Sequence, residues 1–520
     1  MIKILEVNSV DLIGNRWNGY DMIEELKKDF DVRQAVVQKL SDNPKVVELV
    51  SGESKKVIHD KFMHYEEPLE SVKCVLSISS PLLMRTKEYK EADIIHIHLL
   101  HNSGMSLYSL RKIAQEKKVI ITIHDPWIAT GKCVYPYACE KWKNGCHTCD
   151  NLSSFFPMRE DNCHDMWNLK KKVLEDLDID VVAASDWTED IIKESPILNK
   201  LKNVHKIYFG MNTEKFNKVS YKEARKKLNI SDDEVVLFHR AQNEFKGTPY
   251  VLEALKNLKT EKKVTILTCE GVGLLDEVKD KFNVRDLGVI KDKEMIVAMN
   301  ACDIFLMPSL SESFGLMAIE AMSCAKPVVV FDNSALPSVT RAPKCGYLVK
   351  DRDSADLEKA IKELIENPKE RMRRGKLGKK IVEKDYQEKK YYDSLRKLYK
   401  KVYNKKRKPK KEEKIKETEN ARQYKFYLND LTVRLFGAFS KISKELRYPV
   451  NKKDRIPSYK FEYSDLALQD LAFHYTDKMI DLLDKYEVKK IRNDVFIKVE
   501  KMMYLIGNNP YFIKEKLKRK

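Results

Sequence analysis

Two acidic side chains, Glu312 and Glu320, stand eight residues apart in the segment ESFGLMAIEAM. In a helix that begins near Ser313 or Phe314, Glu320 would lie about two turns after the first residue and near the same face of the helix. The free N–H groups of that start suit a diphosphate, and each carboxylate can accept hydrogen bonds from paired hydroxyls. The spacing therefore indicates a phosphate site flanked by hydroxyl-rich groups; the alternative is two carboxylates in solvent.

Two cations, Arg240 and Lys246, lie upstream in the segment VVLFHRAQNEFKG. Arg240 follows an apolar run that predicts a strand, and Lys246 precedes Gly247 at the predicted start of a helix. Two converging cations can neutralise a pyrophosphate. The alternative is a solvated basic pair in a surface loop, but the place after the first strand of a predicted second domain favours phosphate binding.

Near the N-terminus, the segment VIITIHDPW places His124 directly after a predicted strand. The carboxyl ends of parallel strands form the ligand edge of an open sheet, so His124 is a candidate for substrate contact; the alternative is a structural histidine. An earlier loop runs from Gly14 to Gly19 and allows a phosphate to approach the backbone closely. Arg16 in this loop is a further source of positive charge.

Cysteines gather in a short stretch of the same half, at Cys133, Cys139, Cys146 and Cys149. The C-x-x-C pair lets two thiolates share one ion, and the two earlier sulfurs can complete a tetrahedral zinc site. A redox pair or free thiols are the competing interpretations, because 10 cysteines in 520 residues are too sparse for a disulfide scaffold. The spacing predicts structural zinc, with Cys163 and His164 as a weaker substitute pair.

Apolar runs that alternate with amphipathic stretches predict the elements that carry these residues. Alternation of this kind is typical of βαβ units, and two such series predict two doubly wound domains with ligands between them at the carboxyl ends of strands. The predicted strands are Ile2–Val7, Ile94–Leu99, Val119–Ile123, Val181–Ala184 and Lys206–Phe209, and then Val235–Phe238, Val264–Leu267, Leu287–Ile290, Ile304–Met307 and Val328–Phe331.

The formal net charge of +18 is concentrated at one end of the chain. Residues 400–520 hold 32 basic and 17 acidic residues, and the densest part is KKVYNKKRKPKKEEKIK at 400–416. Apolar residues recur there at helical spacing, at Leu428, Leu431, Leu435, Phe439 and Ile442. A small helical domain that packs on the body is one interpretation; a basic surface that holds the protein on anionic lipid is another, favoured for the linker.

Nucleic acid is set aside as a partner, because the chain has no recognised binding motif. The sequence also has no apolar run of about 18 residues, so we expect a cytoplasmic protein, peripheral on the inner face of the cell membrane where the basic linker contacts it.

The segment around Glu312 resembles the signature of the retaining glycosyltransferases of family 4, which have the GT-B fold. The resemblance covers the residues from Glu312 to Leu316, Glu320 to Met322 and Lys326 to Val329, and it extends to Asp303, Pro308 and Gly346. The stretch ADIIHIHLLHNSG and the one that contains His124 resemble the same family, particularly enzymes that build bacterial surface polysaccharides.

The resemblance implies a role for each candidate residue. Glu312 would contact the transferred sugar, Phe314, Gly315 and Leu316 would present backbone amides to sugar and phosphate, and Glu320 would hold the ribose. Arg240 and Lys246 would stabilise the leaving diphosphate, and His124 would bond the donor sugar or the acceptor. The two cations could replace a metal, so no catalytic metal is expected, and the acids at Asp176, Asp178, Asp180, Asp351 and Asp353 are interpreted as surface residues.

The resulting prediction is an α/β protein of the GT-B class with a basic helical C-terminal extension. It would move a sugar from a nucleoside diphosphate sugar to a glycan or lipid-linked glycan; the alternative is a catalytically silent sugar-nucleotide-binding protein. The predicted parts are an acceptor-side domain at 1–208, a nucleotide-sugar domain at 209–382, a crossover helix at 383–404 and the extension at 405–520.

Overall fold

The computed structural model describes residues 1–12, 18–70, 72–154, 156–242, 244–271, 273–406, 415–438, 440–450 and 461–486. The chain divides into two compact units. The first holds Met1–Val182, Ile191–His205 and Leu398–Lys520, and the second holds Ala183–Asp190 and Lys206–Lys397. The domain boundaries drawn from the sequence stay predictions.

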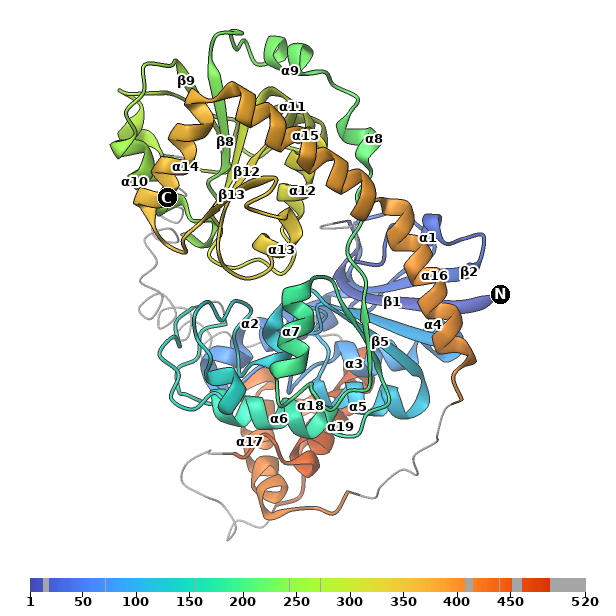
Figure 1. The fold of residues 1–520 in the computed structure, drawn as a ribbon. Coiled ribbons are helices and arrows are strands. Elements are labelled where there is room, and N and C mark those ends of the chain that lie inside the picture. Colours follow the sequence, from blue (N-terminus) through green and yellow to red (C-terminus); the bar gives the residue numbers. More distant parts are fainter. Residues whose placement is uncertain are drawn as a thin grey trace. The chain divides into compact units, whose positions relative to one another are not determined.

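A seven-stranded sheet in the order β3-β2-β1-β4-β5-β6-β7 forms the centre of the first unit (Figure 1). β1 pairs in parallel with both β2 and β4, so the strand order reverses between β1 and β4. Open α/β sheets bind ligands at such a switch point. The strands are β1 (Ile2–Val10), β2 (Phe30–Gln38), β3 (Val46–Glu48), β4 (Ile94–His98), β5 (Lys118–Ile123), β6 (Asp180–Ala183) and β7 (Asn203–Lys206).

The helices of this unit include α1 (Met22–Glu25), α2 (Glu53–Glu70), α3 (Ser79–Arg85), α4 (Lys87–Glu91), α5 (Leu107–Glu116) and α6 (Cys163–Leu174). The chain passes from one unit to the other within α7 (Asp186–Glu194) and α16 (Glu388–Asn404). All five residues of the central strand β4, IIHIH, are buried. Central parallel strands are covered on both faces, which accounts for the apolar run; two histidines within it need polar partners.

The second unit contains a six-stranded sheet in the order β10-β9-β8-β11-β12-β13. Its order reverses between β8 and β11, which pair in parallel. The strands are β8 (Val235–Arg240), β9 (Val264–Cys269), β10 (Asn283–Asp286), β11 (Ile304–Met307), β12 (Val328–Phe331) and β13 (Gly346–Val349). The helices are α8 (Thr213–Phe216), α9 (Tyr221–Lys227), α10 (Thr248–Asn257), α11 (Asp292–Ala301), α12 (Leu316–Ser323), α13 (Leu336–Thr340), α14 (Ser354–Glu366) and α15 (Pro368–Asp385).

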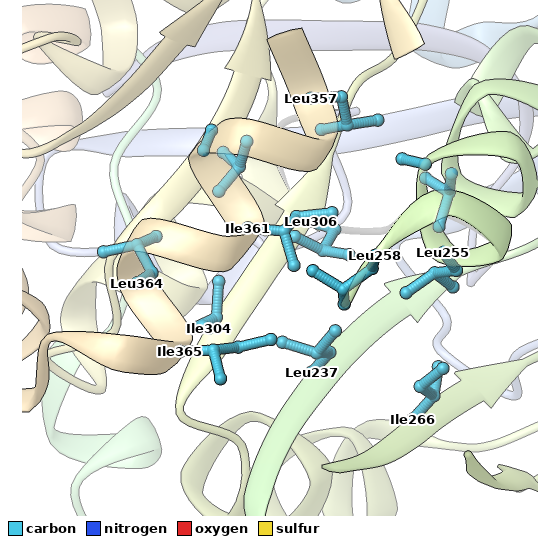
Figure 2. Close-up of a cluster of buried hydrophobic side chains, with 14 of the residues drawn as sticks. Leu237, Leu255, Leu258, Ile266, Ile304, Leu306, Leu357, Ile361, Leu364 and Ile365 are labelled. Carbon is cyan, nitrogen blue, oxygen red and sulfur yellow. The ribbon is translucent and has the colours of Figure 1, made fainter. Parts of the chain in front are cut away.

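Apolar side chains of α10 and α14 form one core of this unit with the sheet (Figure 2). Leu255 on α10, Leu258 directly after it and Ile361 on α14 lie against Leu237 on β8 and Leu306 on β11. Burial of each such side chain contributes roughly 1.5–3 kcal/mol. This core fixes β8 and β11 side by side, and with them the residues that follow both strands.

Some predicted strands differ from the observed ones. The first sheet ends in β7 at Asn203–Lys206 rather than at Lys206–Phe209, and β10 lies at Asn283–Asp286 rather than at Leu287–Ile290. Both are edge strands with exposed or half-buried side chains, so backbone pairing rather than an apolar run defines them. The helix expected from Ser313 or Phe314 begins at Leu316, because Gly315 has a left-handed φ of 90°.

Three helices of the C-terminal extension belong to the first unit: α17 (Glu419–Phe436), α18 (Lys441–Leu446) and α19 (Leu466–Lys485). They pack on one another, and α19 packs on α2, α3 and α5. Arg85 on α3 pairs with Asp477 at 2.6 Å and with Asp481 at 2.7 Å, and the Tyr108 hydroxyl donates to Asp470 at 2.7 Å. The predicted helical spacing is confirmed, since Leu428, Leu431, Leu435 and Ile442 are buried; Phe439 and residues 407–414 of the basic segment lie outside the described residues.

Candidate functional site

The predicted phosphate-binding residues of the second unit gather at the carboxyl ends of β8 and β11. Arg240 is the last residue of β8, and Glu312 lies five residues beyond the end of β11 at Met307. Since the strand order reverses between these two strands, their ends form the switch point at which an open sheet binds a ligand. The fold therefore places two predicted donor contacts where a ligand is expected.

Lys246 and Glu312 form an ion pair with an Nζ–Oε1 distance of 2.7 Å, and both side chains are largely buried. Lys246 ends a short 3₁₀ turn, and Gly247 follows it with a left-handed φ of 77°. A Cβ at Gly247 would meet the carbonyl oxygen of Pro308, so only glycine permits this close approach. The residue predicted to bind the diphosphate thus lies beside the one predicted to bind the sugar.

Arg240 is also paired, with a residue that the motifs did not reveal. Its Nη2 lies 2.6 Å and its Nε 2.9 Å from one carboxylate oxygen of Glu270. Glu270 directly follows β9, and its φ of 59° is left-handed. The sequence signal that could have indicated Glu270 was its position directly after a strand of the same sheet. Both predicted cations are therefore held by carboxylates in this structure.

The backbone before α12 is shaped by a glycine and an inward-facing aromatic ring. A Cβ at Gly315 would lie 2.7 Å from Leu336 Cδ2. The Phe314 ring is buried and packs edge-on against Phe209 and Tyr386, with centroids 5.3 Å and 5.7 Å apart. The ring anchors the turn while α12 begins at Leu316. This arrangement suits amides that bind an anion.

Glu320 lies inside α12 and is only 3% exposed. His239, which precedes Arg240, is also buried and fixes the turn around Lys246. It donates from Nδ1 to the Leu306 carbonyl at 3.1 Å, so its Nε2 accepts from the Thr248 hydroxyl at 3.0 Å. Burial lowers the pKa of His239 to about 4, which keeps the ring neutral. His239 was not singled out from the sequence; its place in an apolar strand was the only signal.

In the first unit, His124 directly follows β5 and hydrogen-bonds a buried chain of polar residues. His124 Nε2 lies 2.9 Å from His98 Nδ1, and His98 Nε2 lies 2.9 Å from Glu6. Glu6 also accepts from the Tyr399 hydroxyl at 2.7 Å. His96 contacts the same hydroxyl through Nδ1 at 2.7 Å. Glu6 and Tyr399 are both far from His124 in the sequence, and no motif predicted them.

The ionised carboxylate of Glu6 can only accept hydrogen bonds, so it determines which ring nitrogens of His98 and His124 carry a proton. Burial acts to raise the pKa of Glu6, but the electrostatic influence of His96 and the hydrogen bonds from His96 and His98 outweigh it and hold that pKa at about 2. Burial lowers the pKa of His98 to about 4, so a neutral His98 gives its only proton to Glu6. His98 Nδ1 must then accept from His124 Nε2–H, and the acceptor lone pair of His124 lies on Nδ1.

A cavity of about 20 Å³ adjoins His124. His101, Asp125 and Trp127 line it as well. Asp125 accepts from the Trp127 N–H at 2.9 Å, and burial raises the pKa of Asp125 to about 7. The small polar cavity could receive a hydroxyl group but is too small for a whole sugar ring.

Cys133, Cys139, Cys146 and Cys149 line one cavity of about 80 Å³. Cys163, the first residue of α6, lines it with them. Burial raises the pKa of Cys133 to about 12 and that of Cys146 to about 11. The fold thus gathers the four predicted thiols and adds a fifth.

Among the described residues, one trio of potential metal ligands has donor atoms within 4.8 Å of one another: Glu6, His96 and His98. Their hydrogen bonds to one another, to Tyr399 and to Thr122 already occupy these atoms. The trio therefore serves as a hydrogen-bond network here. Gly14 and Arg16 lie outside the described residues.

Asp176 and Asp178 are exposed as predicted, but the interpretation of Asp180 as a surface residue was wrong, because Asp180 is buried in β6 and pairs with His205 at 2.7 Å. Asp178 and Asp180 also pair with Lys405. Asp353 caps α14 by accepting from Ala355 and Asp356 N–H groups, and Asp351 accepts from Asn333 at 2.5 Å.

Comparisons with known proteins agree with the motifs. Residues 220–381 match the model of the family described as glycosyl transferases group 1. The chain is 22% identical over 268 residues to WcaC, a colanic acid biosynthesis glycosyl transferase of Escherichia coli K12, with 47% of this chain and 61% of that protein covered. It is 26% identical over 227 residues to a D-inositol 3-phosphate glycosyltransferase of Corynebacterium aurimucosum, with 40% and 53% covered. The chain spans about half the length of the curated relatives that it matches.

Solved structures show the same fold. Sucrose-phosphate synthase from Thermosynechococcus elongatus has a TM-score of 0.57 at 18% identity, over 77% of this chain and 98% of that one. Anabaena HepE in complex with UDP and glucose has a TM-score of 0.52 at 16% identity, over 77% and 100%. The predicted GT-B fold is confirmed, and the predicted family 4 membership is compatible with these matches. The matched segment 220–381 carries Arg240, Lys246, Glu312 and Glu320.

Proposed function

We propose that this chain is a retaining glycosyltransferase that moves a sugar from a nucleoside diphosphate sugar to a glycan or lipid-linked glycan in cell-surface polysaccharide synthesis. The observation that carries the proposal is the Lys246–Glu312 pair at the switch point of the second sheet. A cation for the phosphate and a carboxylate for sugar hydroxyls lie side by side there. The similarity to the colanic acid biosynthesis glycosyl transferase WcaC supports the proposed place in polysaccharide synthesis.

Donor binding would exchange partners at both cations. A diphosphate would replace Glu312 at Lys246 and Glu270 at Arg240, because phosphate and carboxylate offer these cations equivalent acceptors. Glu312 would then be released to accept from the sugar hydroxyls, and Glu320 would hold the ribose. The backbone from Phe314 to Leu316 would bind the phosphate side.

The reaction would break the bond between the anomeric carbon and the diphosphate, whose oxygen keeps the electron pair. Lys246 and Arg240 would stabilise the charge that develops on this oxygen, which is the work a metal does elsewhere. The acceptor hydroxyl would attack on the face from which the diphosphate leaves and pass its proton to the leaving phosphate. His124, with its lone pair on Nδ1, would accept from a hydroxyl of the donor sugar or the acceptor.

The test uses the purified full chain and a panel of nucleoside diphosphate sugars, beginning with UDP-glucose because a similar structure was solved with UDP and glucose. A donor that binds the folded state raises the melting temperature. Transfer to a lipid-linked or soluble glycan is then followed by nucleotide release, and NMR of the product gives the anomeric configuration. We expect the donor's configuration in the product and full activity in EDTA.

Three outcomes would contradict parts of the proposal. An inverted product would exclude the retaining mechanism. Loss of activity in EDTA that returns with Mg²⁺ or Mn²⁺ but not with Zn²⁺ would exclude metal independence of the transfer step. A thermal shift without turnover on any acceptor would favour a silent sugar-nucleotide-binding protein.

We also propose that the enzyme works in the cytoplasm at the inner face of the membrane. The segment 400–416 supports this by its density of Lys and Arg, each of which contributes about 1 kcal/mol near an anionic surface. None of the helices within the described residues combines the length and apolar character of a membrane span. Sedimentation with anionic vesicles at low salt, against neutral vesicles as control, tests the contact; equal binding to both would exclude it.

A further inference from the structure

We propose that Cys133, Cys139, Cys146 and Cys149 bind one zinc ion that holds the loop of the first unit between β5 and α6. The site is structural and does not depend on the proposed transferase activity. All four thiols line the same cavity of about 80 Å³, which has room for an ion between them. All ten cysteines of the chain carry free thiols, so no disulfide competes for these four.

The loop itself has little regular structure to hold it. Between the 3₁₀ turn η1 (Pro126–Ala129) and α6, the described residues contain one further 3₁₀ turn, η2 (Lys141–Asn144), and neither a strand nor an α-helix. Tyr137, Cys146 and Thr148 have left-handed φ angles between 51° and 55°. Non-glycine residues persist in that region only where their surroundings hold them there. Four metal–sulfur bonds would provide that constraint.

A backbone hydrogen-bond donor points at one of the proposed sulfur ligands. The Gly131 N–H donates to Cys146 Sγ at 3.1 Å. A donor of this kind stabilises a thiolate and orients a metal ligand from outside the first coordination sphere. Cys163, which lines the same cavity from the start of α6, donates to the Met158 sulfur at 3.8 Å instead.

Two buried lysines supply positive charge beside the cavity. Lys132 lines it and donates to the carbonyls of Asn151, Leu152 and Ser154 at 2.8–2.9 Å. Lys170 is fully buried and donates to the carbonyls of Trp127, Thr130 and Gly131 at 2.6–3.1 Å. Zinc with four thiolates has net negative charge, which the two lysine side chains would help to neutralise.

The ligand set selects the metal. Thiolate sulfur favours zinc over magnesium and calcium, which prefer oxygen, and four sulfurs close a tetrahedral zinc site without an open position for catalysis. No three of the described thiols have their sulfurs within 4.8 Å of one another, so zinc would draw them inward. The cavity and the sparse loop structure allow that contraction.

The experiment measures metal in the full chain, purified without a chelating tag and with zinc in the growth medium. Mass spectrometry should give about one zinc per chain, and a mercurial that titrates thiols should release it to a chromogenic chelator. Cys133→Ser and Cys149→Ser should retain less than a tenth of that zinc. The matched control is Cys345→Ser, a buried thiol of the second unit, which should keep all of it.

A loss of zinc could also follow from misfolding, so a second measurement uses cobalt. Cobalt added to metal-free wild-type chain should produce the charge-transfer absorption of a tetrahedral thiolate site, and Cys149→His should bind cobalt with a shifted spectrum. Wild-type chain that stays free of metal in excess zinc would overturn the proposal. So would full zinc in the Cys133→Ser/Cys149→Ser double variant, or a native mass two hydrogens lighter that reveals a Cys146–Cys149 disulfide.

Discussion

Charges at the candidate donor site cancel in pairs. Lys246 is held by Glu312, and Arg240 is held by Glu270. In the proposed function, a nucleoside diphosphate would exchange one anionic partner for another at each cation instead of meeting a bare cation. The two ion pairs would then keep both cations in place for a phosphate.

Replacing Lys246 by Ala should reduce kcat/KM by about 10²–10³-fold, because it removes a fixed positive charge from the leaving diphosphate. The measurement is steady-state transfer with the preferred donor. Lys263→Ala is the matched control, since Lys263 is an exposed lysine of the same unit that pairs with Asp233. Wild-type kcat/KM in Lys246→Ala would contradict the assigned role.

Asp125 should make the stability of the chain depend on pH. Burial raises its pKa to about 7 from an ordinary value of 3.8, so between these values the folded state binds more protons than the unfolded state. Its contribution is therefore fully favourable below about pH 4 and is lost as the pH rises through about 7, by at most about 1.4 kcal/mol per pH unit. The nearby groups are His101, 3.6 Å away, and Lys170.

The Asp125→Asn variant isolates this effect, because the amide oxygen can still accept from Trp127. Urea unfolding of both chains from pH 4 to pH 8 should show the variant gaining stability relative to wild type as the pH rises to about 7. A difference that stays constant across this range would show that Asp125 does not titrate there.

At the scale of elements, turns after strands bring the candidate residues together. Gly247 lets the turn after β8 approach Pro308 beyond β11, which sets Lys246 beside Glu312. In the first unit, Tyr399 on α16 reaches Glu6 on β1 and supports the histidine chain that ends at His124. Both contacts join segments that are distant in the sequence.

Gly247→Ala should destabilise the second unit by more than the roughly 1 kcal/mol that a left-handed φ costs a non-glycine residue. Its Cβ would meet backbone, whereas Gly288 has a φ of 67° with nothing within 4 Å of a Cβ. Gly288→Ala is therefore the matched control for the φ cost alone. Urea unfolding should show the larger loss for Gly247→Ala, together with weaker donor binding; equal losses would mean that the Pro308 contact is unimportant.

Tyr399→Phe should cost about 1–3 kcal/mol, because the buried Glu6 carboxylate loses a hydrogen-bond donor. Tyr403→Phe, at an exposed position of the same helix, should change stability by less than about 0.5 kcal/mol. Urea unfolding measures both. If Tyr399→Phe matched the control, the hydroxyl would not support the network.

Buried strands made of apolar residues could be predicted from the sequence. Ile304–Met307 and Val328–Phe331 are observed with the predicted bounds, as β11 and β12. Edge strands β7 and β10 were misplaced because their residues are polar and half-exposed, and their pairing partners are not encoded locally. Glu6 and Glu270 were missed for the same reason, since each acquires its role from a side chain that only the fold brings near.

At the scale of the whole molecule, the C-terminal extension completes the first unit. Helix α19 buries Leu468, Met479 and Leu482 and packs on α2, α3 and α5. The apolar residues that recur at helical spacing could have indicated a helix that faces a membrane. In the structure their side chains pack within the first unit instead. The basic linker before α17 remains the candidate surface for lipid.

A chain that ends at residue 406 should be less stable by several kcal/mol and prone to aggregate, because removal of α17–α19 exposes the apolar faces that they cover. Denaturant unfolding and light scattering measure both effects. Arg85→Ala, which removes only the partly exposed ion pairs to Asp477 and Asp481, should cost less than about 1 kcal/mol. Equal stability of the shortened and full chains would show that the extension is a separate module.

The order of the units along the chain also sets an order of synthesis. Most of the second unit, Lys206–Lys397, is an insertion in the sequence of the first, which resumes at Leu398. All of the second unit has left the ribosome before α19 is made, and domains generally fold as units when their sequence is available. The second unit can therefore fold while the first still exposes the surface that α19 covers. Nascent chains would carry a folded second unit and an incomplete first unit, and chaperones should engage the N-terminal segment until α17–α19 emerge.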